Sequence, residues 1–113
     1  MGIFSFFNDI SGSLKNTEIY GAPIDYLSNI TRELSEISRG SRVLVNNPGR
    51  LKMEYNLTKF TLSIDFIYFA DYIQVTIEVL KPNLGTEVFE CNYDVDEIKN
   101  LVFSSISYIS NGV

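Results

Sequence analysis

The sequence predicts an α+β fold, with an antiparallel meander of four to five strands over residues 42–93 and helices at residues 23–39 and 94–110. Apolar residues recur every three to four positions in the two helical segments, but they alternate with polar residues between them. Short turn-like sequences separate the alternating runs, so neighbouring strands pair antiparallel. Because one side of each run is polar, we expect both helices to cover the apolar face. A chain of 113 residues suits one such domain.

The first residues predict a short amphipathic helix. Over residues 3–14, apolar side chains stand at helical spacing: Ile3, Phe6, Phe7, Ile10 and Leu14. No basic residue precedes this stretch, which argues against a signal peptide. We expect the helix either to close the core or to dock on a second chain; a membrane surface fits less well, because the helix carries Asn8 and Asp9 instead of basic residues. Phe4, Phe6 and Phe7 are the candidate self-association residues.

Residues 23–39 predict the first of the two covering helices. Pro23 suits a first helical turn, where its missing N–H is not needed, and Gly40 is a natural stop. The expected buried stripe consists of Leu27, Ile30, Leu34 and Ile37. The opposite side is polar, so this helix should lie on the sheet with one face only.

The middle of the chain predicts the strands. The alternating runs are residues 42–45, 50–57, 60–68, 73–79 and 86–93. Their phase flips near residues 56–59 and again at residues 70–71, which indicates tight reversals. Asn46–Gly49 and Lys81–Gly85 have turn composition. In a meander the first and last runs are the candidate edge strands.

The second covering helix begins at an acidic sequence. Asp94 stands in an N-cap position, and Glu97 follows at the spacing of a capping box. The expected buried stripe is Ile98, Leu101, Val102, Ile106 and Ile109. The acids therefore have a structural explanation, because negative charge is favoured at a helix N-terminus.

The composition excludes several reaction mechanisms. The chain has no histidine, one cysteine and no glycine-rich phosphate loop, so imidazole-based triads, Cys/His zinc sites and nucleotide-binding loops are excluded. The single Cys91 lies in an apolar alternation and is interpreted as a core residue of a cytoplasmic protein. We therefore expect no enzyme, no cofactor and no metal site.

Charge is distributed unevenly within the net charge of −5. Residues 39–59 hold five basic residues and one acid, whereas residues 60–97 hold eight acids and one lysine. Overall acidity argues against nucleic acid as a partner. No apolar stretch reaches membrane-spanning length, which argues against a membrane. A protein partner with a basic surface fits the acidic half best.

The first functional hypothesis is a small acidic inhibitor or adaptor, like an immunity protein or a phage-encoded antagonist, that occludes a basic site on a partner. Its candidate binding residues are Glu87, Glu90, Asp94, Asp96 and Glu97. One alternative is a structural subunit that self-associates through its edge strands, as a homodimer for example. Another is a small-ligand binder, or an enzyme that uses tyrosine and carboxylates.

Overall fold

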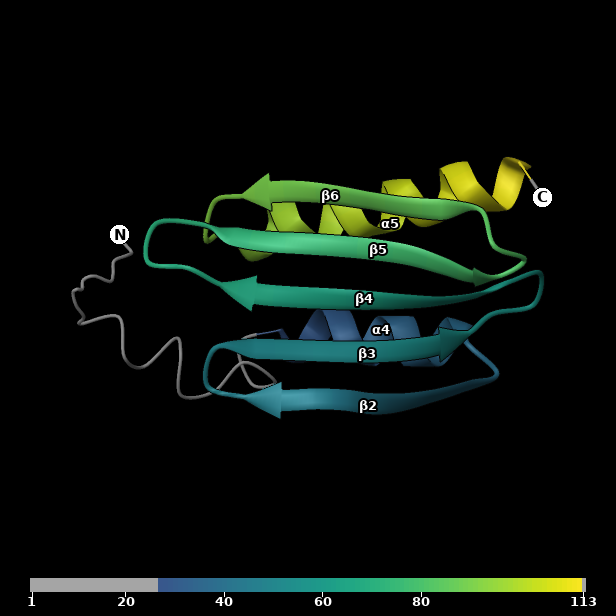
Figure 1. The fold of residues 1–113 in the computed structure, drawn as a ribbon, viewed down its shortest axis with the longest axis horizontal. Helices are drawn as coiled ribbons and strands as arrows, with labels where there is room; N and C mark the ends of the chain where they lie inside the picture. Colours follow the sequence, from purple (N-terminus) through teal and green to yellow (C-terminus); the bar gives the residue numbers. More distant parts are fainter. Residues whose placement is uncertain (1–26, 113) are drawn as a thin grey trace.

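The computed structural model describes residues 27–112 and confirms the α+β fold (Figure 1). The elements in chain order are α4 (Ser28–Ile37), β2 (Gly40–Asn47), β3 (Arg50–Asn56), β4 (Thr61–Tyr68), β5 (Ile73–Lys81), β6 (Gly85–Cys91) and α5 (Val95–Gly112). The helix expected over residues 3–14, with Phe4, Phe6 and Phe7, lies outside the described residues.

The five strands form one antiparallel sheet in the order β2-β3-β4-β5-β6. The meander is therefore confirmed, and among the strands of residues 27–112 β2 and β6 are its edges. The first strand is longer than the predicted residues 42–45. Gly40 pairs with Asn56 at one end of β2 and Asn47 pairs with Arg50 at the other, and a β-bulge lies between Val43 and Val45. Pairing with β3 thus extends β2 to glycine and asparagine residues, although their intrinsic strand propensity is low.

The reversals explain the changes of phase. In the β3–β4 turn the Leu57 N–H donates to the Phe60 carbonyl at 2.9 Å, and in the β4–β5 turn the Phe69 N–H donates to the Tyr72 carbonyl at 2.9 Å. In the β2–β3 turn the Asn47 side-chain oxygen accepts from the Gly49 N–H at 3.0 Å. Each hairpin reverses the chain within a few residues, which fixes the register of the strands.

Both helices lie against the same face of the sheet (Figure 1). The apolar side of the strands and the inner sides of the helices form one buried cluster. At its centre Leu51, Phe66 and Val75 stand side by side on β3, β4 and β5, and all three are fully buried. Leu34 on α4 and Val102 on α5 are also fully buried. The prediction that two helices cover one face of the sheet is confirmed.

The first helix ends earlier than predicted. It begins at Ser28 and stops at Ile37, and Ser38 is already extended. The Arg39 N–H donates to the Asn56 carbonyl at 2.7 Å, so the chain joins the sheet before another helical turn is possible. Two predictions were therefore wrong: Ile37 is half-exposed instead of buried, and Gly40 belongs to β2 instead of stopping the helix.

The face of the sheet opposite the helices, which we call the open face, carries ion pairs. Arg50 donates to Asp65 through two nitrogens, at 3.0 and 2.7 Å. Arg42 donates to Glu54 at 3.1 Å. Asp65 and Glu54 thus each have an arginine partner on this face.

Candidate functional site

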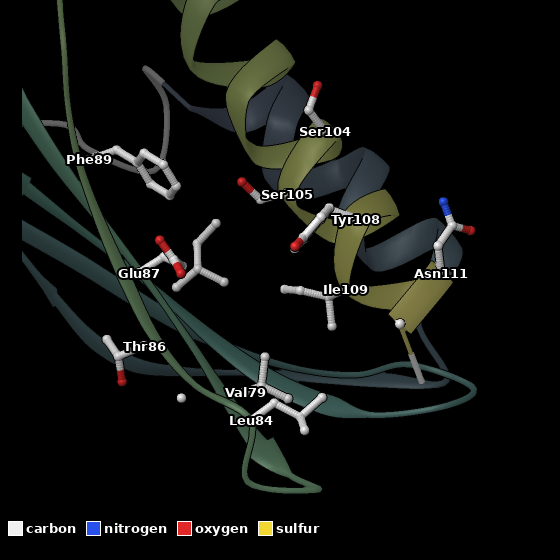
Figure 2. A pocket seen from close by; sticks show the side chains of 13 residues that line it. Val79, Leu84, Thr86, Glu87, Phe89, Ser104, Ser105, Tyr108, Ile109 and Asn111 are labelled. Carbon is white, nitrogen blue, oxygen red and sulfur yellow. The ribbon is translucent and has the colours of Figure 1, made fainter.

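A groove of about 610 Å³ lies between β6 and the C-terminal half of α5 (Figure 2). We call it the β6–α5 groove. Its apolar lining includes Val79, Leu84, Phe89 and Ile109. Polar residues from both elements accompany them: Thr86, Glu87, Ser104, Ser105, Tyr108 and Asn111. The Thr86 side chain itself belongs to the other face of the sheet, because Thr86 pairs with Glu78. The groove therefore offers an apolar surface with hydrogen-bonding groups and one carboxylate.

The register of β6 explains how Glu87 enters this groove. Gly85, Glu87 and Phe89 pair with Val79, Ile77 and Val75 of β5, whose side chains face the helices. Side chains alternate along a strand, so Glu87 lies on the helix side although it is charged. Its carboxylate avoids desolvation because β6 is an edge strand and the residue remains exposed.

The helix contributes the opposite side of the groove. Ile98, Val102 and Ile106 form the buried stripe of α5, while Ser104 and Tyr108 lie beside that stripe and are exposed. Two consecutive small residues of α5, Ser104 and Ser105, line the groove, and the Ser105 side chain points toward β6 (Figure 2). Because a serine side chain is small, it leaves the space between β6 and α5 unfilled at this point.

The five predicted acids do not form one continuous patch. Glu87 lies in the β6–α5 groove, whereas Glu90, three residues along the same strand, belongs to the open face. Asp94 immediately precedes α5, and Asp96 and Glu97 lie in its first turn. All five belong to the β6–α5 side of the domain, but the structure brings only the last three together.

The predicted helix cap is confirmed, with one change. An Asp94 carboxylate oxygen accepts from the backbone N–H groups of Asp96 and Glu97, at 3.0 and 3.2 Å. The Glu97 carboxylate accepts from the backbone N–H of Asn92 at 3.2 Å, two residues before the position that a capping box would use. The carboxylates of Asp94 and Glu97 thus stabilise the β6–α5 corner.

This cap gives a testable result. Replacing Asp94 with alanine should lower the free energy of unfolding by about 1 kcal/mol, because two N–H groups lose their acceptor. Asp94→Asn should preserve most of the stability, since asparagine caps equally well. Asp96→Ala removes the same charge without removing the cap, and should cost about 0.3 kcal/mol. Urea denaturation followed by circular dichroism measures all three; equal losses for Asp94→Ala and Asp96→Ala would mean that charge alone matters.

Burial is the main cause of a raised pKa at two side chains, Tyr55 and Cys91. Burial, with a smaller contribution from the Glu97 charge, raises the pKa of Cys91 to about 11. Burial also raises the pKa of Tyr55, whose hydroxyl has no hydrogen-bond partner among the described residues. Neither residue lines the groove. Within residues 27–112, no group of three or more Cys, Asp or Glu side chains is placed to hold a metal ion.

Sequence reasoning missed the groove itself. Tyr108 is 83% exposed and Leu84 is 54% exposed, and neither was singled out from its sequence context. One signal was present: Glu87 stands four residues before Cys91, the expected core residue of this run, so the two side chains share one phase of the strand. The space beside it depends on α5, which is distant in sequence.

Comparisons with protein-family models, with curated proteins and with solved structures found no match for this chain. In the described part of the chain, neither helix has the length and apolarity that a bilayer crossing requires.

Proposed function

We propose that this chain is a non-enzymatic protein-binding module, an inhibitor or adaptor, that receives an extended segment of a partner protein along β6. The observation that carries the proposal is the position of the β6–α5 groove directly beside an edge strand. The preferred segment alternates basic and apolar residues. Binding would occlude that segment from its other targets.

The geometry supports recognition by strand addition. Among the described strands, β6 pairs only with β5, so its outer edge presents backbone donors and acceptors. A partner strand that pairs there would point every second side chain toward the β6–α5 groove and the others toward the open face. The backbone would supply affinity, and the groove would select the side chains.

The charge of this side supports a basic partner. Residues 85–112 carry five acidic residues and one basic residue, a net charge of −4. The basic residue, Lys99, is already bonded to Glu33 of α4 at 2.8 Å. Glu87 is the acid inside the groove, and a lysine or arginine there would find an opposite charge next to apolar surface. Such complementarity raises the association rate and selects the partner.

Exposed side chains at the groove are suitable binding anchors. Tyr108 projects from α5, and Leu84 lies in the β5–β6 connection (Figure 2). Aromatic residues that become buried on binding commonly supply a large share of the binding energy. Tyr108 should therefore contribute more than the surrounding serines, Ser104 and Ser105.

Peptide titration followed by amide NMR tests this proposal. The probe is a peptide of alternating Lys and Val, and the control peptide alternates Glu and Val. The Lys/Val peptide should shift amide signals along β6 and in the second half of α5, and Glu87→Lys should weaken its binding about tenfold, or about 1.4 kcal/mol. Glu36→Lys, an equal charge change on exposed α4, is the matched control.

Two results would contradict the proposal. One is the absence of signal changes along β6 at millimolar Lys/Val peptide. The other is equal weakening by Glu87→Lys and Glu36→Lys, which would mean that only the overall charge matters. Replacing Glu87, Glu90 and Asp96 together with lysine should abolish binding while the circular dichroism spectrum stays unchanged. Asp94 is left intact in that variant because it caps α5.

A second candidate is a small amphipathic ligand in the same groove. The groove volume of about 610 Å³ falls within the range of small-molecule sites, roughly 300–1,000 Å³. An apolar lining with one carboxylate suits an amine with a hydrophobic body. A thermal-shift screen against such amines identifies this candidate, since a ligand at 100 times its Kd adds about 2.7 kcal/mol of stability.

A further inference from the structure

The exposed large apolar side chains of residues 27–112 are concentrated at two opposite edges. Six of them, between 39% and 83% exposed, divide equally between the edges. Ile37, Val43 and Leu44 lie on α4 and β2, and Leu84, Val88 and Tyr108 lie on or next to β6 and α5. The seventh, Phe69, stacks on Tyr72 in the β4–β5 turn. Apolar surface is therefore exposed where the sheet ends.

The two edges have opposite charge on both faces of the sheet. On the helix side, Arg32 lines a second groove of about 200 Å³ beside Val43, while Glu87 lies in the β6–α5 groove. On the open face, Arg42 projects from β2 and Glu90 projects from β6. Residues 28–47, which form α4 and β2, carry three basic and two acidic residues, a net charge of +1, whereas residues 85–112 carry a net charge of −4.

The basic residues are able to exchange partners. Arg32 bonds Glu36 at 3.3 Å, and Arg42 bonds Glu54 at 3.1 Å, but both arginine side chains are mostly exposed. Exposed ion pairs contribute only about 0–1 kcal/mol. A second copy that offers a carboxylate at a desolvated contact therefore competes with these intramolecular pairs.

The direction of the strands allows the two edges to meet. Five antiparallel strands leave β2 and β6 pointing the same way (Figure 1). A second copy moved sideways without rotation places its β2 beside β6 in parallel, with the helices of both copies on one side. Strand alternation then keeps Val43 on the same side as Glu87, and Arg42 on the same side as Glu90.

We infer that copies of this chain associate head to tail, with the β2–α4 edge of one copy against the β6–α5 edge of the next. This inference rests on the proposed function, and it names a second copy as the partner whose strand β6 receives. The bulge between Val43 and Val45 limits backbone pairing, so contacts between α4 and α5 side chains carry much of the interface.

A contact between the β2–α4 edge of one copy and the β6–α5 edge of another is favoured over a contact between two identical edges. A two-fold contact between two β6 edges would bring Glu87 and Glu90 against the same acids, and a contact between two β2 edges would oppose arginines. A contact between different surfaces leaves one edge of each kind free, so it builds a ring or an open chain of copies. A copy that has engaged another copy at β6 cannot bind another protein there.

Sedimentation velocity of the full chain over a concentration series tests this inference. The sedimentation coefficient should rise with concentration and fall back in high salt. Glu87→Arg with Glu90→Arg should keep the protein monomeric to at least tenfold higher concentration, and so should Arg32→Glu with Arg42→Glu. An equimolar mixture of the two variants should associate again, because it restores a basic edge against an acidic edge.

Control variants carry charge changes of the same sign away from the edges. They are Asp71→Arg in the β4–β5 turn and, separately, Lys59→Glu with Lys81→Glu; both should associate like the unmodified protein. A monomer at every concentration overturns the inference, and so does a mixture that stays monomeric. If the monomer still binds the Lys/Val peptide along β6, the proposed function survives alone. If the monomeric protein does not bind the Lys/Val peptide either, both the proposed function and this inference are wrong.

Discussion

Replacing Phe66 with alanine should lower the free energy of unfolding by about 3–5 kcal/mol. Phe66 is fully buried on β4, the central strand, between Leu51 and Val75. Both helices cover the same face, so the space left by the ring has a rigid strand on one side and packed helices on the other. Little collapse is possible, and the loss is a large part of the roughly 5–15 kcal/mol that stabilises a domain.

Ile67→Ala is the matched control for this prediction. Ile67 is the next residue on β4, but it faces the open side and is half-buried. Its truncation should cost on the order of 1 kcal/mol, because less apolar surface returns to water. Urea denaturation of both variants measures the difference. Equal losses would contradict a core that lies on one face of the sheet only.

Replacing Arg50 with alanine should destabilise the protein by about 1–3 kcal/mol, the second largest effect that we expect. Asp65 is only 7% exposed, and Arg50 holds it with two hydrogen bonds. These bonds, together with the charge of Asp65, raise the pKa of Arg50. Without the guanidinium, a buried carboxylate loses its charged partner. The arginine side chain is 41% exposed, so solvent screening moderates the loss.

A double-mutant cycle isolates this pair. Arg50→Ala and Asp65→Ala are measured alone and together by urea denaturation, and the double variant should lose less stability than the sum of the single variants. Arg42→Ala, which breaks the more exposed pair with Glu54, should cost at most about 1 kcal/mol. Additive losses for Arg50 and Asp65 would show that the two side chains do not stabilise each other.

The strands were predictable because their pattern is local and strong. Each run alternates, each phase change coincides with a hairpin, and the apolar phase of β3, β4 and β5 is the buried phase. The end of α4 was not predictable in this way. Ile37 continues the helical stripe, but the backbone bond from Arg39 to Asn56 draws the chain into the sheet. A contact between residues distant in sequence overrides the local pattern there.

The predicted acidic binding residues illustrate a similar limit of prediction from local sequence. Closeness in sequence suggested one patch from Glu87 to Glu97, but residues three apart on a strand lie on opposite faces. Strand alternation alone was sufficient to separate Glu87 from Glu90. The β6–α5 groove was beyond such reasoning, because its open space depends on how Ser104 and Ser105 stand relative to β6.

The burial of Cys91 has a practical consequence. This thiol ends β6, and at neutral pH it is protonated and sheltered from solvent, since its pKa is raised to about 11. An alkylating reagent attacks the thiolate, so labelling requires the end of β6 to detach first. The rate of Cys91 alkylation therefore reports local opening of the edge strand β6. A molecule that binds along this edge and holds it in place should slow the alkylation.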